Sequence, residues 1–294
     1  MKILIVGVLD VFSSTNIQIK KAFEDLGCET VDFNYRTIAK EVGYPKMEDN
    51  LVEEVKKNKY DLVFLCKTNK MNPNYITRVN EFSKTWFWWM DPIGTCRADN
   101  CAEFARRGTW CSATSTEVYK VFSTVNKNSY KIYEGFNPDI FCKLDVPKVY
   151  DIIFVGSPNN KRRRIIEKLR KEGLKVTTFG PGFENPSMFL KDLNRINNQS
   201  RIILNICRSD IFSNRVFEAA GSGSFVLTET CTDIKEDFPN FACFQDAASC
   251  TRLTVYYINH PEERVAVAKR NYEVVSNYTW KRQMEKVLNF IKNS

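Results

Sequence analysis

Short apolar runs alternate with helix-like segments along almost the whole chain, and this alternation limits the folds open to it. Residues 2–8 and 60–66 are mostly apolar runs of strand length, and residues 13–16 supply capping side chains for a helix after the first run. Strands that alternate with helices in this way pair in parallel, and the helices cover both faces of the sheet. The sequence therefore predicts an α/β fold built on parallel sheets.

The alternation starts again in the middle of the chain. Residues 135–147 carry two prolines and no clear periodicity, which is typical of a linker, and a new strand is predicted at 150–155. We expect two Rossmann-like domains facing across a cleft, residues 1–146 and residues 147–294, with the last helix able to pack back on the first domain. Ligands of such sheets bind beyond the carboxyl ends of the strands.

Composition excludes several classes of protein. No apolar run approaches the roughly 18–20 residues that span a bilayer, and the first residues resemble a strand rather than a signal peptide. We therefore expect no membrane insertion and a cytoplasmic location, which would be the host cytoplasm if the chain is viral. The ten cysteines contain no C-x-x-C pair, so no metal site is expected. The single histidine, His260, precedes Pro261 in a helix-start context, which leaves acid–base chemistry to carboxylates.

Positive charge is concentrated in the second half of the chain. Residues 148–294 carry 23 Lys and Arg against 16 Asp and Glu, whereas residues 1–147 are almost balanced, with 20 against 19. The second half is therefore expected to bind an anion, either a nucleotide phosphate, a nucleic acid or an acidic surface.

The segment 213–228 is the most informative of the chain. Its pattern predicts a short helix that begins at Ser213 or Asn214, carries Arg215 and Glu218, and runs through small residues into an apolar strand. Free backbone N–H groups at such a helix start attract phosphate, and an arginine one residue inside adds a charge-assisted contact. Glu218, about one turn further on, is placed to accept hydrogen bonds from ribose hydroxyls. The alternative is an ordinary amphipathic helix with a glycine C-cap.

A glycine and a run of cations follow the strand predicted at 150–155. Gly156 and Ser157 end this strand, and four consecutive cations, beginning with Lys161 and Arg162, open the next helix. The segment lacks both a Walker loop and the G-x-G-x-x-G fingerprint, so the usual modes of ATP and NAD binding are not expected. Cations at a helix start oppose the helix dipole unless an anion such as a diphosphate compensates. A solvated basic face is the alternative.

An aromatic strand, residues 86–90, ends in Asp91 and Pro92. Its position at the carboxyl end of the first sheet makes Asp91 a candidate general base. Asp10, which follows the first strand, is the second candidate. The alternative is that Asp91 caps a helix after a packed core strand.

Together these segments resemble a GT-B glycosyltransferase, specifically the spore-maturation-protein-like group. Residues 151–157, 215–227 and 278–282 carry the resemblance in the second half, and Asp91-Pro92 and residues 134–141 carry it more loosely in the first. The resemblance implies a hexosyltransferase-like transfer of sugar that needs neither a metal ion nor a cofactor. The donor would be a nucleoside-diphosphate sugar, UDP-linked, and the second domain would hold most of it. The first domain would hold the acceptor, whose hydroxyl receives the sugar. The resemblance places Glu218 on the ribose. Related retaining enzymes have a second glutamate, eight residues before the ribose glutamate and near the donor sugar. In this chain that position is Asp210.

Three matters stay open at this level. Asp91 would deprotonate the acceptor in an inverting reaction, and would only orient it in a retaining one. The sequence does not identify the acceptor. One candidate is a modified base in viral DNA, because the basic second half would suit the DNA backbone and the aromatic cluster would suit a flipped base. The alternative to an enzyme is a non-catalytic protein with the same fold that binds sugar nucleotides or nucleic acid.

Overall fold

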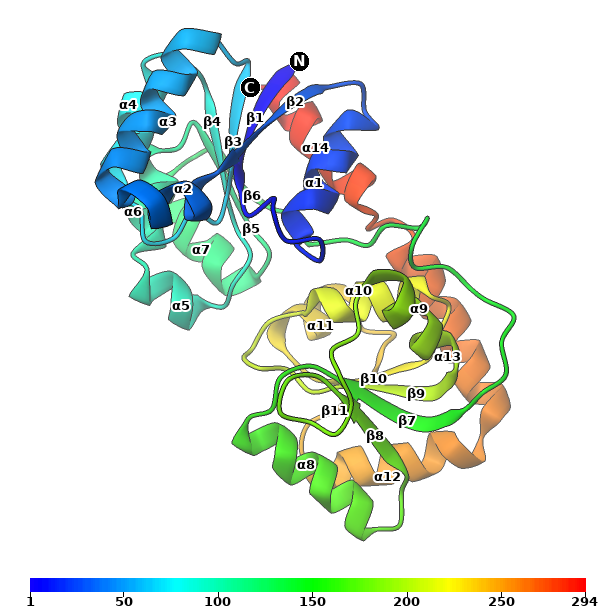
Figure 1. The fold of residues 1–294 in the computed structure, drawn as a ribbon. Helices are drawn as coiled ribbons and strands as arrows, with labels where there is room; N and C mark the ends of the chain where they lie inside the picture. Colours follow the sequence, from blue (N-terminus) through cyan, green and yellow to red (C-terminus); the bar gives the residue numbers. More distant parts are fainter. The chain divides into compact units, whose positions relative to one another are not determined.

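The computed structural model describes residues 1–294, and the chain forms two compact units (Figure 1). The first unit contains Met1–Glu134 and Trp280–Ser294, and the second contains Gly135–Thr279. Each unit is built on one sheet whose strands are all parallel. The predicted fold class of parallel-sheet α/β domains is thereby confirmed.

The sheet of the first unit has six strands in the order β2-β1-β3-β4-β5-β6. Its strands are β1 (Lys2–Gly7), β2 (Glu29–Asn34), β3 (Leu62–Cys66), β4 (Thr85–Trp89), β5 (Trp110–Ala113) and β6 (Ser129–Lys131). Its helices are α1 (Thr15–Glu24), α2 (Tyr35–Val42), α3 (Tyr44–Asn58), α4 (Asn74–Asn80), α5 (Ile93–Ala98), α6 (Cys101–Arg107), α7 (Thr116–Val125) and α14 (Trp280–Lys292).

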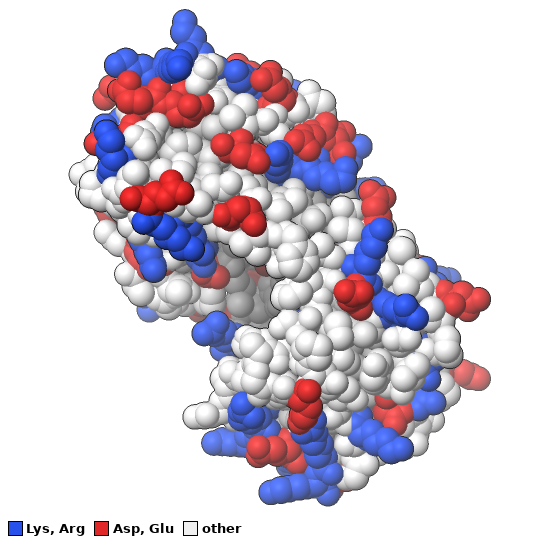
Figure 2. Space-filling view, viewed as in Figure 1, with Lys and Arg blue, Asp and Glu red and all other residues white.

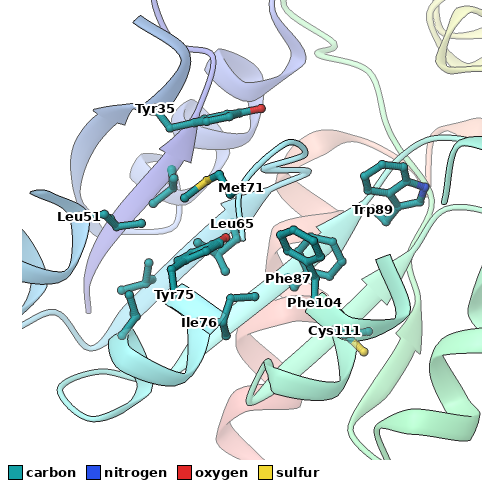
Figure 3. Packing of buried hydrophobic residues seen from close by; sticks show 14 of the residues in the cluster. Tyr35, Leu51, Leu65, Met71, Tyr75, Ile76, Phe87, Trp89, Phe104 and Cys111 are labelled. Carbon is teal, nitrogen blue, oxygen red and sulfur yellow. The ribbon is translucent and has the colours of Figure 1, made fainter. Parts of the chain in front are cut away.

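The aromatic strand β4 lies in the middle of this sheet and is buried on both faces. Phe87 and Trp89 pack toward α4, α6 and α7, with the Phe104 ring 5.4 Å from that of Phe87 (Figure 3). Trp86 and Trp88 face the opposite way, toward α1 and α14. Because side chains alternate along a strand, every ring of β4 lies in one of the two cores.

The last helix, α14, completes the core of the first unit. The Trp280 ring lies 6.1 Å from that of Trp88, and Phe290 stacks on Tyr130 at 3.9 Å between ring centroids. Nε1 of Trp110 donates a hydrogen bond to Oγ of Ser294, 2.9 Å away. Without α14, the rings of Trp88, Trp110 and Tyr130 would lose this cover.

The sheet of the second unit has the order β11-β10-β9-β7-β8. Its strands are β7 (Tyr150–Val155), β8 (Val176–Phe179), β9 (Ser200–Asn205), β10 (Val226–Glu229) and β11 (Ala242–Phe244). Its helices are α8 (Asn160–Lys171), α9 (Leu190–Asn198), α10 (Asn214–Gly221), α11 (Thr232–Asp237), α12 (Ala247–Asn259) and α13 (Pro261–Val275). Helices α8 and α12 cover one face of the sheet, and α9 and α10 cover the other (Figure 1).

The segment predicted as a linker belongs to the second unit. Backbone N–H groups of Cys142 and Leu144 donate to the side-chain oxygens of Asn194 and Asn198 on α9, at 3.2 and 2.9 Å. The ring of Phe136 occupies the space that a Cβ on Gly221 would need. These contacts move the division between the units to Gly135, whereas the sequence places it after residue 146. An irregular segment held by distant asparagines gives no periodic signal.

No helix combines the length and the apolar character that a bilayer crossing needs.

Candidate functional site

The start of α10 brings four of the predicted site residues together. Ser213 is the N-cap, and its Oγ accepts a hydrogen bond from the backbone N–H of Arg215 at 3.3 Å. Nδ2 of Asn214 donates to Oε1 of Glu218 at 3.1 Å, and Nη1 of Arg215 lies 3.2 Å from Oε2 of the same carboxylate. Glu218 is largely buried, with 17% of its side chain exposed. A carboxylate, an amide and a guanidinium therefore share one helix turn.

The polar groups of this turn are incompletely satisfied. Oδ1 of Asn214 and Nη1 of Arg215 are buried and make no hydrogen bond. Burial raises the pKa of Glu218, and the charge of Arg215 only partly opposes this effect. Buried polar atoms are almost always paired in folded proteins, because leaving one unpaired costs about 1–3 kcal/mol. A small rotation of either side chain onto a ligand would remove that cost.

The basic run that opens α8 makes specific internal contacts. The Arg162 guanidinium donates to the carbonyl oxygens of Ile206 and Ser157, at 3.0 and 2.8 Å, and Nζ of Lys161 contacts Oε2 of Glu229 at 2.8 Å. These contacts join the ends of β7, β9 and β10. Figure 2 shows blue side chains along the lower edge of the second unit, where Figure 1 places α8. The first two cations of the run thus hold the carboxyl ends of three strands in place.

Two glycines allow the backbone to fold tightly beside this run. Gly156 follows β7, and its N–H donates to the carbonyl of Phe179 at 2.9 Å. The φ of Gly180 is +138°, and a Cβ at this position would overlap the carbonyl oxygen of Gly156. Any side chain at Gly180 would therefore displace the loop that contains Gly156 and Ser157.

Asp210 is bonded to the start of α11 rather than to Arg215 or Glu218. Its side chain is exposed and accepts hydrogen bonds from N and Oγ1 of Thr232, at 3.0 and 2.8 Å. In this arrangement Asp210 connects the loop after β9 to the start of α11.

The first unit has a cavity of about 480 Å³ beside the carboxyl ends of β1, β3 and β4. Asp91, from the end of β4, lines it and forms an ion pair with Lys67, which follows β3 and lies over the Trp89 ring. Lys67 and Thr68 have φ values of 68° and 36°, a left-handed backbone that non-glycine residues rarely adopt. Such strain gathers at binding sites, where the surrounding structure maintains it.

Asp10, the second predicted base, takes a different position. It is exposed, accepts a hydrogen bond from Oγ1 of Thr37 and does not line the cavity. The tryptophans of β4 belong to the two cores, so the aromatic cluster predicted beside Asp91 does not form an open surface.

Two residues of these sites were not predicted from the sequence. Lys67 pairs with Asp91 in the first unit, and Glu229 pairs with Lys161 in the second. Lys67 and Glu229 stand at or just after the carboxyl end of a buried strand, where parallel sheets present their functional side chains. That position is a signal the sequence contains. No three His, Cys, Asp or Glu side chains are grouped so that they could hold a metal ion.

Comparison with solved structures decides the architecture. Sucrose-phosphate synthase from Thermosynechococcus elongatus is similar over 100% of this chain and 98% of its own, with a TM-score of 0.73 and 13% identity. The chain has the GT-B fold. An α-glucosyltransferase solved with UDP-glucose and DNA containing an abasic site is similar over 99% of both chains, with a TM-score of 0.67 and 12% identity.

Further comparisons agree with this fold. The lipopolysaccharide outer core galactosyltransferase WaaB is similar over 100% of this chain and 99% of its own, with a TM-score of 0.65 and 10% identity. The sequence profile of the family described as Glycosyl transferase-like matches residues 161–289, which include α8 and α10. No curated protein sequence matches the chain. The spore-maturation-protein-like group stays a prediction.

Proposed function

We propose that this chain is a glycosyltransferase that moves a sugar from a UDP-linked donor to an acceptor hydroxyl without a metal ion. The observation that carries the proposal is the turn at the start of α10. There Arg215 and Asn214 hold buried, unsatisfied polar atoms beside the carboxylate of Glu218. This turn follows β9 at the end of a parallel sheet, where ligands of such sheets bind. The GT-B fold and the family match over residues 161–289 support the same assignment.

The donor is assigned to the second unit. In the proposal, Glu218 accepts hydrogen bonds from the ribose, and Arg215 binds the diphosphate together with N–H groups at the start of α10. Gly156 and Ser157 allow the close approach of the donor, while Lys161 and Arg162 hold this edge of the sheet and add positive potential. Asp210, which is exposed, is assigned to the donor sugar.

The acceptor is assigned to the cavity of the first unit. Its hydroxyl oxygen forms a bond to the anomeric carbon while the bond from that carbon to the diphosphate breaks. In an inverting reaction the hydroxyl proton passes to Asp91. The ion pair with Lys67 fixes the orientation of this carboxylate, as proton transfer to a positioned base requires. Arg215 stabilises the negative charge that develops on the departing diphosphate.

A thermal-shift and hydrolysis panel tests the donor assignment. UDP-glucose and other UDP-sugars are offered with EDTA present, and a raised melting temperature together with slow release of UDP is expected. Glu218→Ala and Arg215→Ala should each abolish the shift, whereas Lys171→Ala, at the far end of α8, should preserve it. A shift that survives both site substitutions would show that the donor binds elsewhere. A shift without UDP release from any donor would indicate a binding protein, and activity lost in EDTA would overturn metal independence.

A base in DNA is the second candidate acceptor. The α-glucosyltransferase that was solved with UDP-glucose and DNA is similar over 99% of both chains, and this observation favours it. Transfer to duplex DNA that carries hydroxymethylated bases should then fall steeply as salt rises, because phosphate contacts release counterions. Equal transfer at low and high salt would contradict a DNA acceptor.

A further inference from the structure

The second unit has a cavity of about 490 Å³ that is separate from the proposed donor site. It is lined by Lys148 just before β7, by Arg201 at the start of β9, and by Gly223 and Ser224 just before β10. These residues stand at the amino ends of three neighbouring parallel strands, whereas the proposed donor site stands beyond their carboxyl ends. Strands of this length rise roughly 3.3 Å per residue, so the two sites are on the order of 15–20 Å apart.

Positive charge dominates the lining of this cavity. The residues that line it include five cations and no carboxylate: Lys143, Lys148, Arg201, Arg264 and Lys269. Only Arg201 has an acidic partner, Asp151. Lys143 and Lys269 form no ion pair and no side-chain hydrogen bond. Cations that crowd together without counter-charge repel one another, and a bound anion would relieve this repulsion.

Two further cations are held in place by backbone carbonyls. Nζ of Lys148 donates to the carbonyls of Asn198 and Ser200, at 2.7 and 2.9 Å. Arg264 donates through Nη1 to the carbonyl of Tyr257 at the end of α12. Burial lowers the pKa of Lys148 and of Arg264, and neighbouring cations lower both further. Fixed donors lose little conformational entropy when an anion binds, so the site is preorganised.

Most of the other residues that line the cavity are apolar. Phe225 and Ala268 of this lining are buried, and Val265 and Tyr272 on α13 have 66% and 44% of their surface exposed. Two exposed apolar side chains next to a cationic cluster form an amphiphilic surface. A volume near 490 Å³ also falls within the roughly 300–1,000 Å³ that is usual for small-molecule sites.

We propose that this cavity binds a phosphate ester whose organic part carries an aromatic or other apolar group. The phosphate contacts Lys143, Lys148 and Lys269, while the organic part packs against Val265 and Tyr272. The ester can be a free metabolite or the headgroup of a lipid, since both present the same chemistry. The proposal does not rest on the function assigned to the chain, because no residue of the proposed donor site takes part in it.

Calorimetric titration of the whole two-unit chain at low salt tests the phosphate and the apolar contacts. Phenyl phosphate is expected to bind more tightly than inorganic phosphate, and phenol more weakly than either. Lys143→Ala/Lys269→Ala should weaken phenyl phosphate binding by about tenfold or more, since two charge-assisted contacts are lost. The matched variant Lys168→Ala/Lys171→Ala removes two cations from α8 and should bind as the unaltered protein does. Arg215→Ala, which tests the donor site, should also leave this binding unchanged.

Further experiments distinguish a lipid headgroup from a free phosphate ester as the ligand. Co-sedimentation with phosphatidic acid vesicles that is lost in Lys143→Ala/Lys269→Ala supports a lipid headgroup, and binding of phenyl phosphate without vesicle binding supports a free ester. Equal binding of phenyl phosphate to both double variants, or none at millimolar concentration, would overturn the proposal. Binding of duplex DNA that depends on Lys143 and Lys269, without phenyl phosphate binding, would overturn it as well.

Discussion

Nη1 of Arg215 lies 3.2 Å from Oε2 of Glu218, one turn along α10, yet the contact is an ion pair without a hydrogen bond. Both side chains are mostly shielded, with 26% and 17% exposed. In a largely buried environment, removing one partner leaves the other charge unpaired, whereas removing both leaves no unpaired charge. The pair is therefore expected to be coupled in stability as well as in donor binding.

A double-mutant cycle measures this coupling. Arg215→Met should lower the free energy of unfolding of the second unit, because it leaves the buried Glu218 carboxylate unpaired, and it should cost less in a Glu218→Gln background. A coupling free energy of about 1–2 kcal/mol is expected. Scanning calorimetry is suitable, because all five tryptophans lie in the first unit and their fluorescence does not report on the second. Additive effects of the two substitutions would show that the ion pair adds nothing.

Asp91→Asn is expected to separate transfer from donor binding. The amide keeps the size of the side chain but is a poor base, so sugar transfer should fall by about 10²-fold or more in an inverting enzyme. The shift in melting temperature given by the best UDP-sugar should not change, because Asp91 belongs to the first unit. Asp10→Asn is the matched control, since Asp10 does not line the cavity. Undiminished transfer by Asp91→Asn would exclude it as the base and favour a role in orienting the acceptor.

Trp280→Ala should destabilise the first unit, although this residue follows the whole of the second unit in the sequence. Trp280 is 4% exposed and packs beside Trp88, Met284 and Val287. Truncating such a buried aromatic residue costs about 3–5 kcal/mol. Tryptophan fluorescence during urea unfolding reports on the first unit, and Lys281→Ala on the exposed side of α14 is the control. If both variants unfold at the same urea concentration, the packing of α14 is not important for stability.

The stability of the first unit should depend on pH through Glu48. Its Oε1 accepts a hydrogen bond from the backbone N–H of Asn72 at 2.6 Å, but burial outweighs that bond and raises the pKa of the carboxyl. Because the folded pKa exceeds the unfolded one, the contribution of Glu48 to stability is full below the unfolded pKa, about 4.3, and is lost as pH rises through the folded pKa.

Glu48→Gln tests this dependence, because the amide oxygen can accept the same bond and does not titrate. The variant should gain in free energy of unfolding over the unaltered protein as pH rises from about 4 to 7, with little difference at the acid end. Glu53→Gln, on the exposed side of α3, shows the effect of losing a surface carboxylate. A difference between Glu48→Gln and the unaltered protein that is constant with pH would contradict the effect of burial on the pKa.

Much of the architecture follows from local patterns in the sequence. The runs at 2–8, 60–66 and 150–155 correspond to β1, β3 and β7, because a strand buried on both faces needs continuous apolar residues. The helix at residue 214 begins where its capping serine predicts, because an N-cap acts within one turn of chain.

The contacts between distant residues could not be predicted in this way. The pairing of Lys67 with Asp91, and that of Lys161 with Glu229, depends on which strands are neighbours in each sheet. Asparagines of α9 hold residues 142 and 144 by hydrogen bonds. These residues lie in a segment without periodicity, so no local pattern indicates the contact.

The parallel α/β class, the second βα series and the polar turn at Arg215 and Glu218 can thus be predicted from local patterns, because each depends on residues within a few positions of one another. The fold alone shows that α14 closes the first core and that five cations meet at the amino ends of β7, β9 and β10. The reason is physical: hydrophobic burial and charge clustering depend on proximity in space, and chain topology sets that proximity.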